Sequence, residues 1–190
     1  MRALANWSGA IAGLLLIVIG GLIQAALPGV GPRGFELISL PISLQVPALL
    51  LTALVCGPRP AMLAGVAYIS LGLFQLPVFH AGGGLVYLLD PGFGYLAGFL
   101  PAAWVTGRLA KQPGMDNLLS LAGAAVIGLA ILQGCGIANL LLGAIAGRWG
   151  GGLPQLLVSY SLGPILPQLL LCCAVAVLAL PLRRLLLVES

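Results

Sequence analysis

The stretch LPVFHAGGGLVYLLDPGFGYLAGF, residues 76–99, decides how the chain is organised. It is rich in glycine and proline and lies between two apolar segments, which is rare for a loop of a soluble protein. The glycines 82–84 leave the backbone free to take positive φ angles and to approach a ligand closely. Pro91, Gly92 and Gly94 interrupt the chain again before the next helix. Irregular backbone at a membrane is tolerated where it lines a cavity or is buried in protein, although such loops are also found as plain connectors.

The composition identifies an integral membrane protein. Of the 190 residues, 61% are hydrophobic and only 6% are charged, whereas a soluble domain has roughly 25% charged residues. A membrane-spanning helix needs about 20 apolar residues, and charge-free stretches recur along the chain. We therefore expect an all-α protein of one domain, residues 1–190, with six transmembrane helices and glycine-rich outer loops, the first over 27–41. The expected spans are 3–26, 42–56, 61–77, 94–109, 118–142 and 163–182.

The basic residues predict the orientation of these spans. If the N-terminus is cytoplasmic, six of the eight basic residues lie inside, namely Arg2, Arg59, Arg108, Lys111, Arg183 and Arg184. Arg33 and Arg148 then lie outside, and this split obeys the positive-inside rule. We expect a multi-pass plasma-membrane protein with both termini in the cytoplasm and with 76–99 on the outer side. Since the positive charges are scattered along the chain, nucleic acid is not an expected partner.

Polar and aromatic residues from nearly every expected helix fall near its outer end. They are Gln45, Gln75, Phe79, Asp90, Tyr95, Asn139, Arg148, Trp149, Tyr160 and Gln168. Small-molecule sites are usually concave and mostly apolar, with a few placed polar groups. The pattern predicts a site for a small amphipathic molecule, although the topology alone gathers some of these residues on one side. We interpret Gln133, within the fifth span, as a helix-to-helix hydrogen bond, because an unpaired amide is costly in hydrocarbon.

Several chemical functions are excluded because the residues they need are missing. The chain has no GxxxxGK[ST] sequence, so it is not a P-loop ATPase, and energy for transport has to come from a partner. No acidic residue lies in the middle of a span, which argues against an ion-coupled carrier. The four cysteines show no zinc-ligand spacing, and we expect neither metal nor cofactor. The poorer alternative is an intramembrane enzyme, which would need His80, the one histidine, as its base, for instance in a dyad with Ser43 or Ser161.

Small residues recur at four-residue spacing in the first span, at Ala5, Gly9 and Gly13, with Ser8 and Ala12 beside them. Such a ridge allows another helix to approach closely. The approaching helix can belong to the same chain or to a partner protein.

The segment GPRPAMLAGVAYISLGLFQLPVFHAGGGLVYLLDPGFGYLAGF, residues 57–99, resembles the signature of the BioY family, the biotin-binding S components of energy-coupling-factor transporters. LPISLQ, residues 40–45, is similar to the PFTLQ that precedes the second helix of that family. The resemblance extends over the whole chain. The matching residues of the signature are Gly57, Pro58, Gly65, Tyr68, Gly72, Leu76, Pro77, Val78, Phe79, Gly82, Gly84, Pro91, Gly94, Tyr95, Gly98 and Phe99.

The resemblance implies the S-component fold and capture of biotin on the outer side of the bilayer, with no catalytic residue. It implies a transmembrane coupling protein and two cytoplasmic ATPases as partners, with Ala5, Gly9 and Gly13 as the docking face. The S component would tilt in the membrane to release its ligand inside, and the outer loops would act as the gate. The sequence leaves open whether the protein forms a homo-oligomer. The expected ligand-binding residues are Gln45, Tyr68, Phe79, Gly83, Gly84, Asp90, Tyr95, Asn139 and Gln168.

Two departures from the family pattern concern the ligand. The family's GPTGGY is DPGFGY here, which places Gly92 and Phe93 at the Thr and Gly positions. The sixth helix of the family opens with an Asp and, three residues later, a Lys, and the aligned residues here are Leu169 and Cys172. Gln168 is the polar residue left nearby, and its amide can donate to and accept from a ureido ring. Losing a charge-assisted hydrogen bond costs about 1.5–3 kcal/mol, so a different small vitamin stays open as the ligand.

Overall fold

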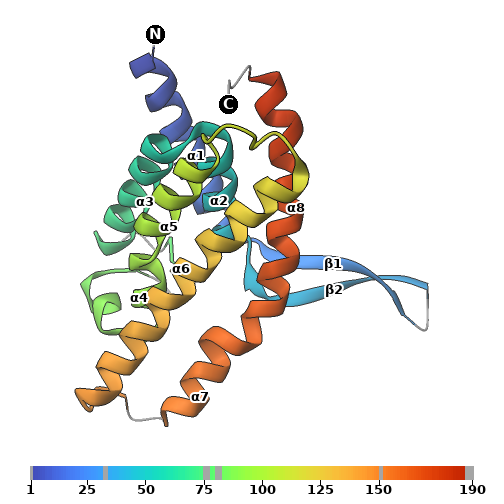
Figure 1. The fold of residues 1–190 in the computed structure, drawn as a ribbon. Coiled ribbons are helices and arrows are strands. Elements are labelled where there is room, and N and C mark those ends of the chain that lie inside the picture. The colour runs from blue at the N-terminus through green and yellow to red at the C-terminus, as the bar shows by residue number, and fades with distance from the viewer. Residues whose placement is uncertain (1, 32–33, 75–77, 80–82, 150–151, 187–190) are drawn as a thin grey trace.

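The computed structural model describes residues 2–31, 34–74, 78–79, 83–149 and 152–186, and it is a helical bundle with one two-stranded sheet (Figure 1). A 3₁₀ turn covers Leu85–Leu89 and a π turn covers Val158–Leu162. The other elements are α1 (Arg2–Leu22), β1 (Gln24–Gly31), β2 (Gly34–Ser43), α2 (Gln45–Cys56), α3 (Pro58–Leu73), α4 (Phe93–Ala97), α5 (Phe99–Leu109), α6 (Leu118–Ile145), α7 (Leu153–Leu157) and α8 (Gly163–Leu185).

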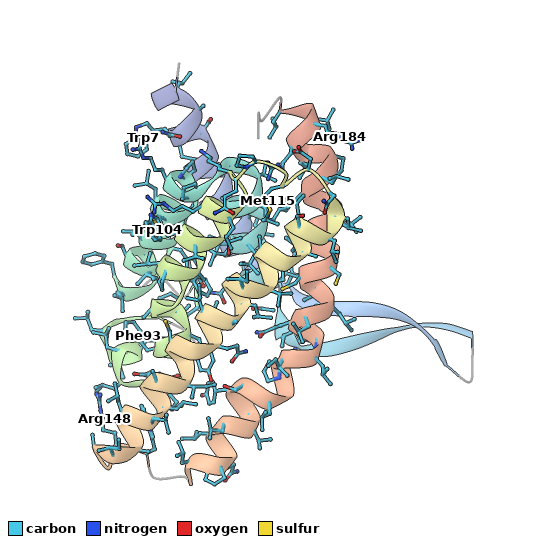
Figure 2. The ribbon with its side chains drawn as sticks, viewed as in Figure 1. Trp7, Phe93, Trp104, Met115, Arg148 and Arg184 are labelled. Carbon is cyan, nitrogen blue, oxygen red and sulfur yellow. The ribbon has the colours of Figure 1, made fainter. Side chains whose placement is uncertain are left out.

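The bundle has two ends of different character. The start of α1, the α2–α3 turn, the α5–α6 connection and the end of α8 lie at one end, here called the terminal end (Figure 1). The 3₁₀ turn, α4, the end of α6 and α7 lie at the opposite end, here called the distal end. Helix α2 is central, since it contacts α1, α3, α5, α6 and α8. Figure 2 shows Arg184 at the terminal end and Arg148 at the distal end.

Three helices in the described residues are long and apolar enough to cross a membrane: Leu4–Leu22, Leu118–Ile145 and the continuous helix Leu153–Leu185. Helix α2 is apolar but has 12 residues, which is about 18 Å at a rise of 1.5 Å per residue. The expected span 94–109 is divided into α4 and α5 at Gly98. The pattern is that of a multi-pass membrane protein.

The segment expected as the first outer loop, 27–41, belongs to an antiparallel hairpin. Strands β1 and β2 pair from Gln24 with Ser43 to Gly31 with Gly34. The first helix therefore ends at Leu22, and the hairpin projects from the bundle beside α8 (Figure 1). Pro28 ends any helical continuation because it lacks an N–H, whereas β-branched residues such as those of β2 favour a strand.

The last helix begins at Leu153, earlier than the expected 163, because α7 and the π turn continue directly into α8. Pro154 is compatible with this start, since the first turn of a helix has no N–H bonds to lose. The earlier start places Tyr160 and Ser161 in the π turn within the helix. Isolated π turns inside helices are frequent at functional sites.

The core depends on glycines that let helices approach closely. A Cβ atom on Gly107 of α5 would lie 2.5 Å from Pro58 N at the α2–α3 turn. A Cβ atom on Gly128 of α6 would lie 2.0 Å from the Thr106 hydroxyl, and Thr106 Oγ1 donates to Ala124 O at 3.4 Å. These contacts join α2, α3, α5 and α6 toward the terminal end.

The small-residue ridge of α1 is used mainly inside the molecule. A Cβ atom on Gly13 would lie 2.4 Å from the Thr52 side chain, and one on Gly9 would lie 3.2 Å from Cys56. Gly13 is buried and Gly9 is half-buried. Gly13 is therefore covered by the chain's own α2 and α3, whereas Gly9 also lines a groove at the terminal end together with Ala5. The exposed small residues on this part of α1 are Ala5, Ser8 and Ala12.

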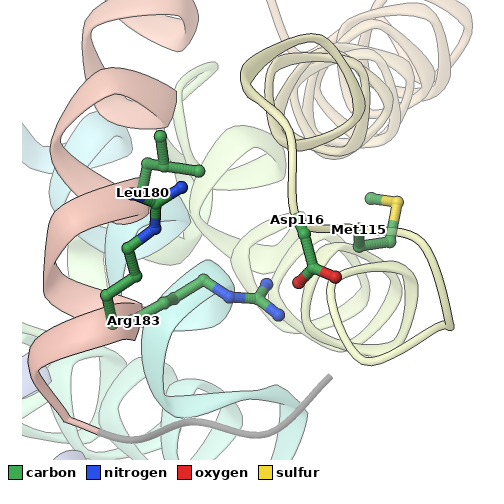
Figure 3. Close-up of a pocket in the computed structure, with 5 residues that line it drawn as sticks. Met115, Asp116, Leu180 and Arg183 are labelled. Atoms are coloured by element: carbon green, nitrogen blue, oxygen red, sulfur yellow. The ribbon is translucent and has the colours of Figure 1, made fainter.

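Arg183 of α8 joins three helices at the terminal end. It is 6% exposed, and its Nη1 donates to Ala110 O at 2.8 Å and to Leu54 O at 3.4 Å. These carbonyls end α5 and α2, where backbone oxygens have no partner within their own helix. The positive charge also faces the negative ends of two helix dipoles. Arg183 lines a pocket of about 140 Å³ together with Met115 and Asp116 (Figure 3).

Candidate functional site

Aromatic side chains form one wall of the distal end. The rings of Tyr68 and Phe79 meet edge to face at 5.4 Å, and those of Phe79 and Tyr87 are 4.7 Å apart. The Tyr68 hydroxyl donates to Val78 O at 2.7 Å, which ties the 78–79 segment to α3. Phe79 lies against Gly72, where a Cβ atom would be only 2.1 Å from its ring. The wall therefore depends on α3 and on the absence of a side chain at Gly72.

A second group forms where α4, α6 and the last helix meet. The rings of Tyr95 and Tyr160 stack at 6.2 Å, and the hydroxyls of Tyr95 and Ser161 share a hydrogen bond. The Tyr95 ring lies over Gly136 of α6, where a Cβ atom would be 2.2 Å from it. Tyr95 therefore holds these three elements together at the distal end.

Asp90 lies between the two aromatic groups. Its Oδ1 accepts a hydrogen bond from Gly92 N at 2.7 Å. A Cβ atom on Gly92 would lie 3.3 Å from the Tyr160 ring and 3.4 Å from the Tyr87 hydroxyl. Burial raises the pKa of Tyr87 to about 12, with smaller contributions from Asp90 and Tyr160. The Tyr87 hydroxyl is therefore protonated at neutral pH and can donate a hydrogen bond.

Three of the expected site residues shape the loop backbone. Asn139 Nδ2 donates to Pro91 O at 3.2 Å, which ties the distal end of α6 to the loop. Gly84 has a φ of 101°, a conformation that favours glycine, and its N–H donates to Gly72 O at 2.7 Å. Gly83 is exposed. Asn139 and Gly84 therefore fix the loop against α6 and α3.

Three glutamines lie among the apolar and aromatic residues of the bundle interior, where Tyr68 and Phe79 belong to the buried core. Gln45 at the start of α2 is 8% exposed, and Gln133 of α6 is 6% exposed. Gln133 Nε2 donates to Gln168 Oε1 of α8 at 2.8 Å, which confirms the helix-to-helix bond expected of Gln133. The Gln45 amide lies close to the Tyr68 hydroxyl without forming a hydrogen bond to it. Gln45 Nε2 and Gln133 Oε1 have no hydrogen-bond partner among the described residues.

Two of the expected outer residues, Arg148 and Trp149, lie just after the end of α6. Trp149 Nε1 donates to Leu140 O at 3.0 Å, and its ring lies over Gly143. Arg148 is exposed, 6.0 Å from the Trp149 ring. Gln75 and His80 lie outside the described residues. Within the part of the chain that the structure describes, no cluster of His, Cys, Asp and Glu could hold a metal ion.

The sequence analysis brought together most of this site but missed two members. Tyr87 stands in the 76–99 stretch, and its place three residues before Asp90 is the signal that could have found it. Ser161 follows Tyr160, and the sequence indicated it only as a possible dyad partner of His80. Aromatic rings, neutral hydroxyls and amides together suit a small, largely apolar ligand with a polar head group.

The BioY family model matches residues 2–187 of the chain. The "probable biotin transporter BioY" of Lysinibacillus sphaericus is 34% identical over 125 residues, which are 66% of this chain and 59% of that protein. The biotin transporter BioY of Thermotoga maritima is 36% identical over 123 residues, 64% of this chain and 66% of that protein. The chain thus spans less than two thirds of the length of both relatives. For the Rhodobacter capsulatus biotin transporter BioY, the identity is 36% over 137 residues, 70% of this chain and 67% of that protein.

A solved structure has the same fold. The crystal structure of the S component for biotin from an ECF-type ABC transporter matches with a TM-score of 0.74 and 19% identity. The match covers 96% of this chain and 93% of the other. At this identity the likeness shows the fold alone, and it confirms the S-component fold that the sequence resemblance implied.

Proposed function

The chain belongs to the BioY family, and from this premise we propose that it is the biotin-binding S component of an energy-coupling-factor transporter. The observation that carries the proposal is the pairing of an aromatic wall, Tyr68, Phe79 and Tyr87, with buried neutral amides in the interior of the bundle. Biotin has a compact bicycle, in which a neutral cyclic urea is fused to an apolar sulfur-containing ring, and a tail that ends in a carboxylate. The aromatic wall suits the bicycle, and the amides suit the ureido group.

The proposed ligand-binding residues are those expected from the sequence. Tyr68 and Phe79 would contact the bicycle, and Gln45, Tyr95 and Gln168 would bind its polar atoms. Gly83 and Gly84 would allow close approach of the backbone, while Asp90 and Asn139 would position the loop and bound water. The full set is Gln45, Tyr68, Phe79, Gly83, Gly84, Asp90, Tyr95, Asn139 and Gln168.

Equilibrium binding of labelled biotin to the purified protein in detergent tests this function. We expect a Kd between nanomolar and low micromolar, about −12 to −8 kcal/mol, and full competition by unlabelled biotin. Replacing Phe79 by Ala should weaken binding while the protein stays monodisperse. A folded protein that binds no biotin would contradict the ligand, and a panel of other small vitamins would then identify the alternative substrate.

We propose six crossings, over 3–26, 42–56, 61–77, 94–109, 118–142 and 163–182, with both termini in the cytoplasm. Support comes from the terminal end, where Arg59, Lys111 and Arg184 lie, whereas Arg148 lies at the distal end. In a background without native cysteines, a membrane-impermeant thiol reagent should label Ala146→Cys in whole cells. Gln112→Cys should react only after the cells are opened, and the reverse pattern would contradict this orientation.

We propose a transmembrane coupling protein and two cytoplasmic ATPases as partners, since the chain has no nucleotide-binding sequence of its own. A groove of about 750 Å³ at the terminal end supports a docking site on α1. Its lining includes Ala5 and Gly9 of the expected docking residues, with Ser8 and Ala12 beside them, and small residues allow a partner helix to approach closely. Ser8→Leu should reduce co-purification with the coupling module without changing biotin binding, and unchanged co-purification would contradict this docking site.

A further inference from the structure

We infer that Gln133 contacts the ligand, and that Gln45 and Gln133 together form a neutral amide site for a urea-like group, held in place by Gln168. This inference rests on the proposed function. It adds one ligand-binding residue and a reason why the site prefers a urea to a charged group. It rests on two buried polar atoms, Gln45 Nε2 and Gln133 Oε1, which lack partners within the described residues.

The two atoms belong to side chains that are more than nine-tenths buried. Buried polar atoms in native proteins nearly always have a hydrogen-bond partner, and each exception calls for an explanation. The helix-to-helix bond to Gln168 uses only the Nε2 group of Gln133. The carbonyl oxygen of the same amide is left over, and a bound ligand would supply its missing partner.

The two amides lie at the same depth in the bundle. Helices α2 and α6 run in opposite directions, and the Leu50 side chain comes within 2.8 Å of a Cβ atom placed on Gly128. Gln45 lies five residues before Leu50, and Gln133 lies five residues after Gly128. Each amide is therefore displaced from this contact by about 7.5 Å toward the distal end.

The surroundings of the amides are apolar and aromatic. Val46, next to Gln45, packs against both core clusters, one of which contains Tyr68 and Phe79, and Leu169, next to Gln168, packs against the other. Toward the distal end the next groups are aromatic, since the Gln45 amide lies close to the Tyr68 hydroxyl. A ligand ring against the aromatic wall would thus present its polar atoms to these amides.

One unpaired atom is a hydrogen-bond acceptor and the other is a donor, and this determines which chemical group of a ligand can pair with both. Gln133 Oε1 accepts a hydrogen bond and Gln45 Nε2 donates one. A urea has both an N–H donor and a carbonyl acceptor, so it can satisfy both atoms at once. A guanidinium has no acceptor and a carboxylate has no donor, so each leaves one buried amide atom unpaired.

Methionine substitutions test the inference, because methionine is similar in length to glutamine but has no amide. We expect Gln133→Met and Gln45→Met each to raise the Kd for labelled biotin at least about tenfold. Gln155→Met is the matched control, since Gln155 is exposed on α7, and its Kd should equal that of the wild type. Melting temperatures of all variants are measured alongside.

A second measurement uses the wild-type protein and does not depend on the folding of a variant. The probe is 2-iminobiotin, in which a guanidinium replaces the urea at neutral pH. We expect it to bind at least about tenfold more weakly than biotin. Equal binding of the two compounds, or unchanged biotin binding by both folded methionine variants, would overturn the inference alone. A folded wild-type protein without biotin binding would overturn the proposed function and this inference together.

Discussion

The terminal end and the middle of the bundle differ in how their buried polar groups are paired. At the terminal end, Arg183 donates to carbonyls of α2 and α5, and Thr106 donates to α6. Midway between the two ends, on the distal side of the Leu50–Gly128 contact, Gln45 Nε2 and Gln133 Oε1 lack partners in the described part of the chain. Among the described residues, the buried polar side chains of the terminal end are therefore paired within the protein, whereas the two amides have hydrogen-bonding capacity left for a ligand. Substitutions at the first should change stability, and substitutions at the second should change binding.

Arg183→Met should have the largest effect on stability. It removes the donor for two helix-terminal carbonyls and leaves them buried, which costs about 2–3 kcal/mol for a charged hydrogen bond. The free energy of unfolding, measured by denaturant titration of the purified protein, should fall by this amount. Arg184→Met is the matched control, since Arg184 is exposed on the same helix and should change little. Equal losses of unfolding free energy in both variants would mean that the hydrogen bonds of Arg183 do not contribute to stability.

Gly107→Ala should have the next largest effect. The added Cβ atom would lie 2.5 Å from Pro58 N, so α5 would have to move away from the α2–α3 turn, at about 1–3 kcal/mol. Gly123→Ala is the control, because no atom lies within 4 Å of its added Cβ. In a helix interior this change should stabilise by about 0.5–1 kcal/mol. A thermal melt that rises in both variants would show that the terminal end is less tightly packed than described.

Tyr95→Phe should lower stability. It removes the hydroxyl that bonds to Ser161, and a net hydrogen bond contributes about 0.5–1.5 kcal/mol to the free energy of unfolding, which a denaturant titration measures. Ser161→Ala should produce the same loss, and the double variant should lose no more than either, because both remove one interaction. Fully additive losses in the titration would mean that the two hydroxyls act separately.

The smallest expected effect concerns pH. Because the pKa of Tyr87 is raised to about 12 in the folded protein, against about 10 for a free tyrosine, folding favours the protonated hydroxyl. Its contribution to stability is fully present below pH ~10 and is lost as the pH rises from there through ~12. Thermal melts between these values should fall less steeply for Tyr87→Phe than for the wild type. Parallel slopes would mean that Tyr87 is as solvated when folded as when unfolded.

The sequence predicted the parts of the molecule that a local motif specifies. The glycines and aromatic residues of 57–99 fixed the S-component fold and brought Tyr68, Phe79, Asp90 and Tyr95 to one end. The hairpin over 24–43 was not predicted, because its prolines and glycines are equally typical of an irregular loop and strand pairing depends on a distant partner.

The roles of single residues were harder to predict when they depended on which element approaches. The spacing of Gly9 and Gly13 indicates that some helix comes close but does not identify it as α2 or α3 of the same chain. The position of Arg183 near a helix end predicts only the orientation of the chain in the membrane. The neighbouring sequence does not indicate that its partners are the carbonyls of Leu54 and Ala110. Gln133 was predicted as a helix contact, and the partnerless half of its amide was visible only in the packed structure.

The hydrogen bonds of Arg183 also have a consequence for how the chain folds while it is being synthesised. Helices α2 and α5 leave the ribosome well before α8, so their last carbonyls are made before the arginine that pairs with them. A nascent chain that ends after α6 therefore holds two helix ends without their partner. The insertion of α8 is then the step that closes the bundle, and until it occurs the earlier helices are a natural substrate for membrane chaperones and proteases.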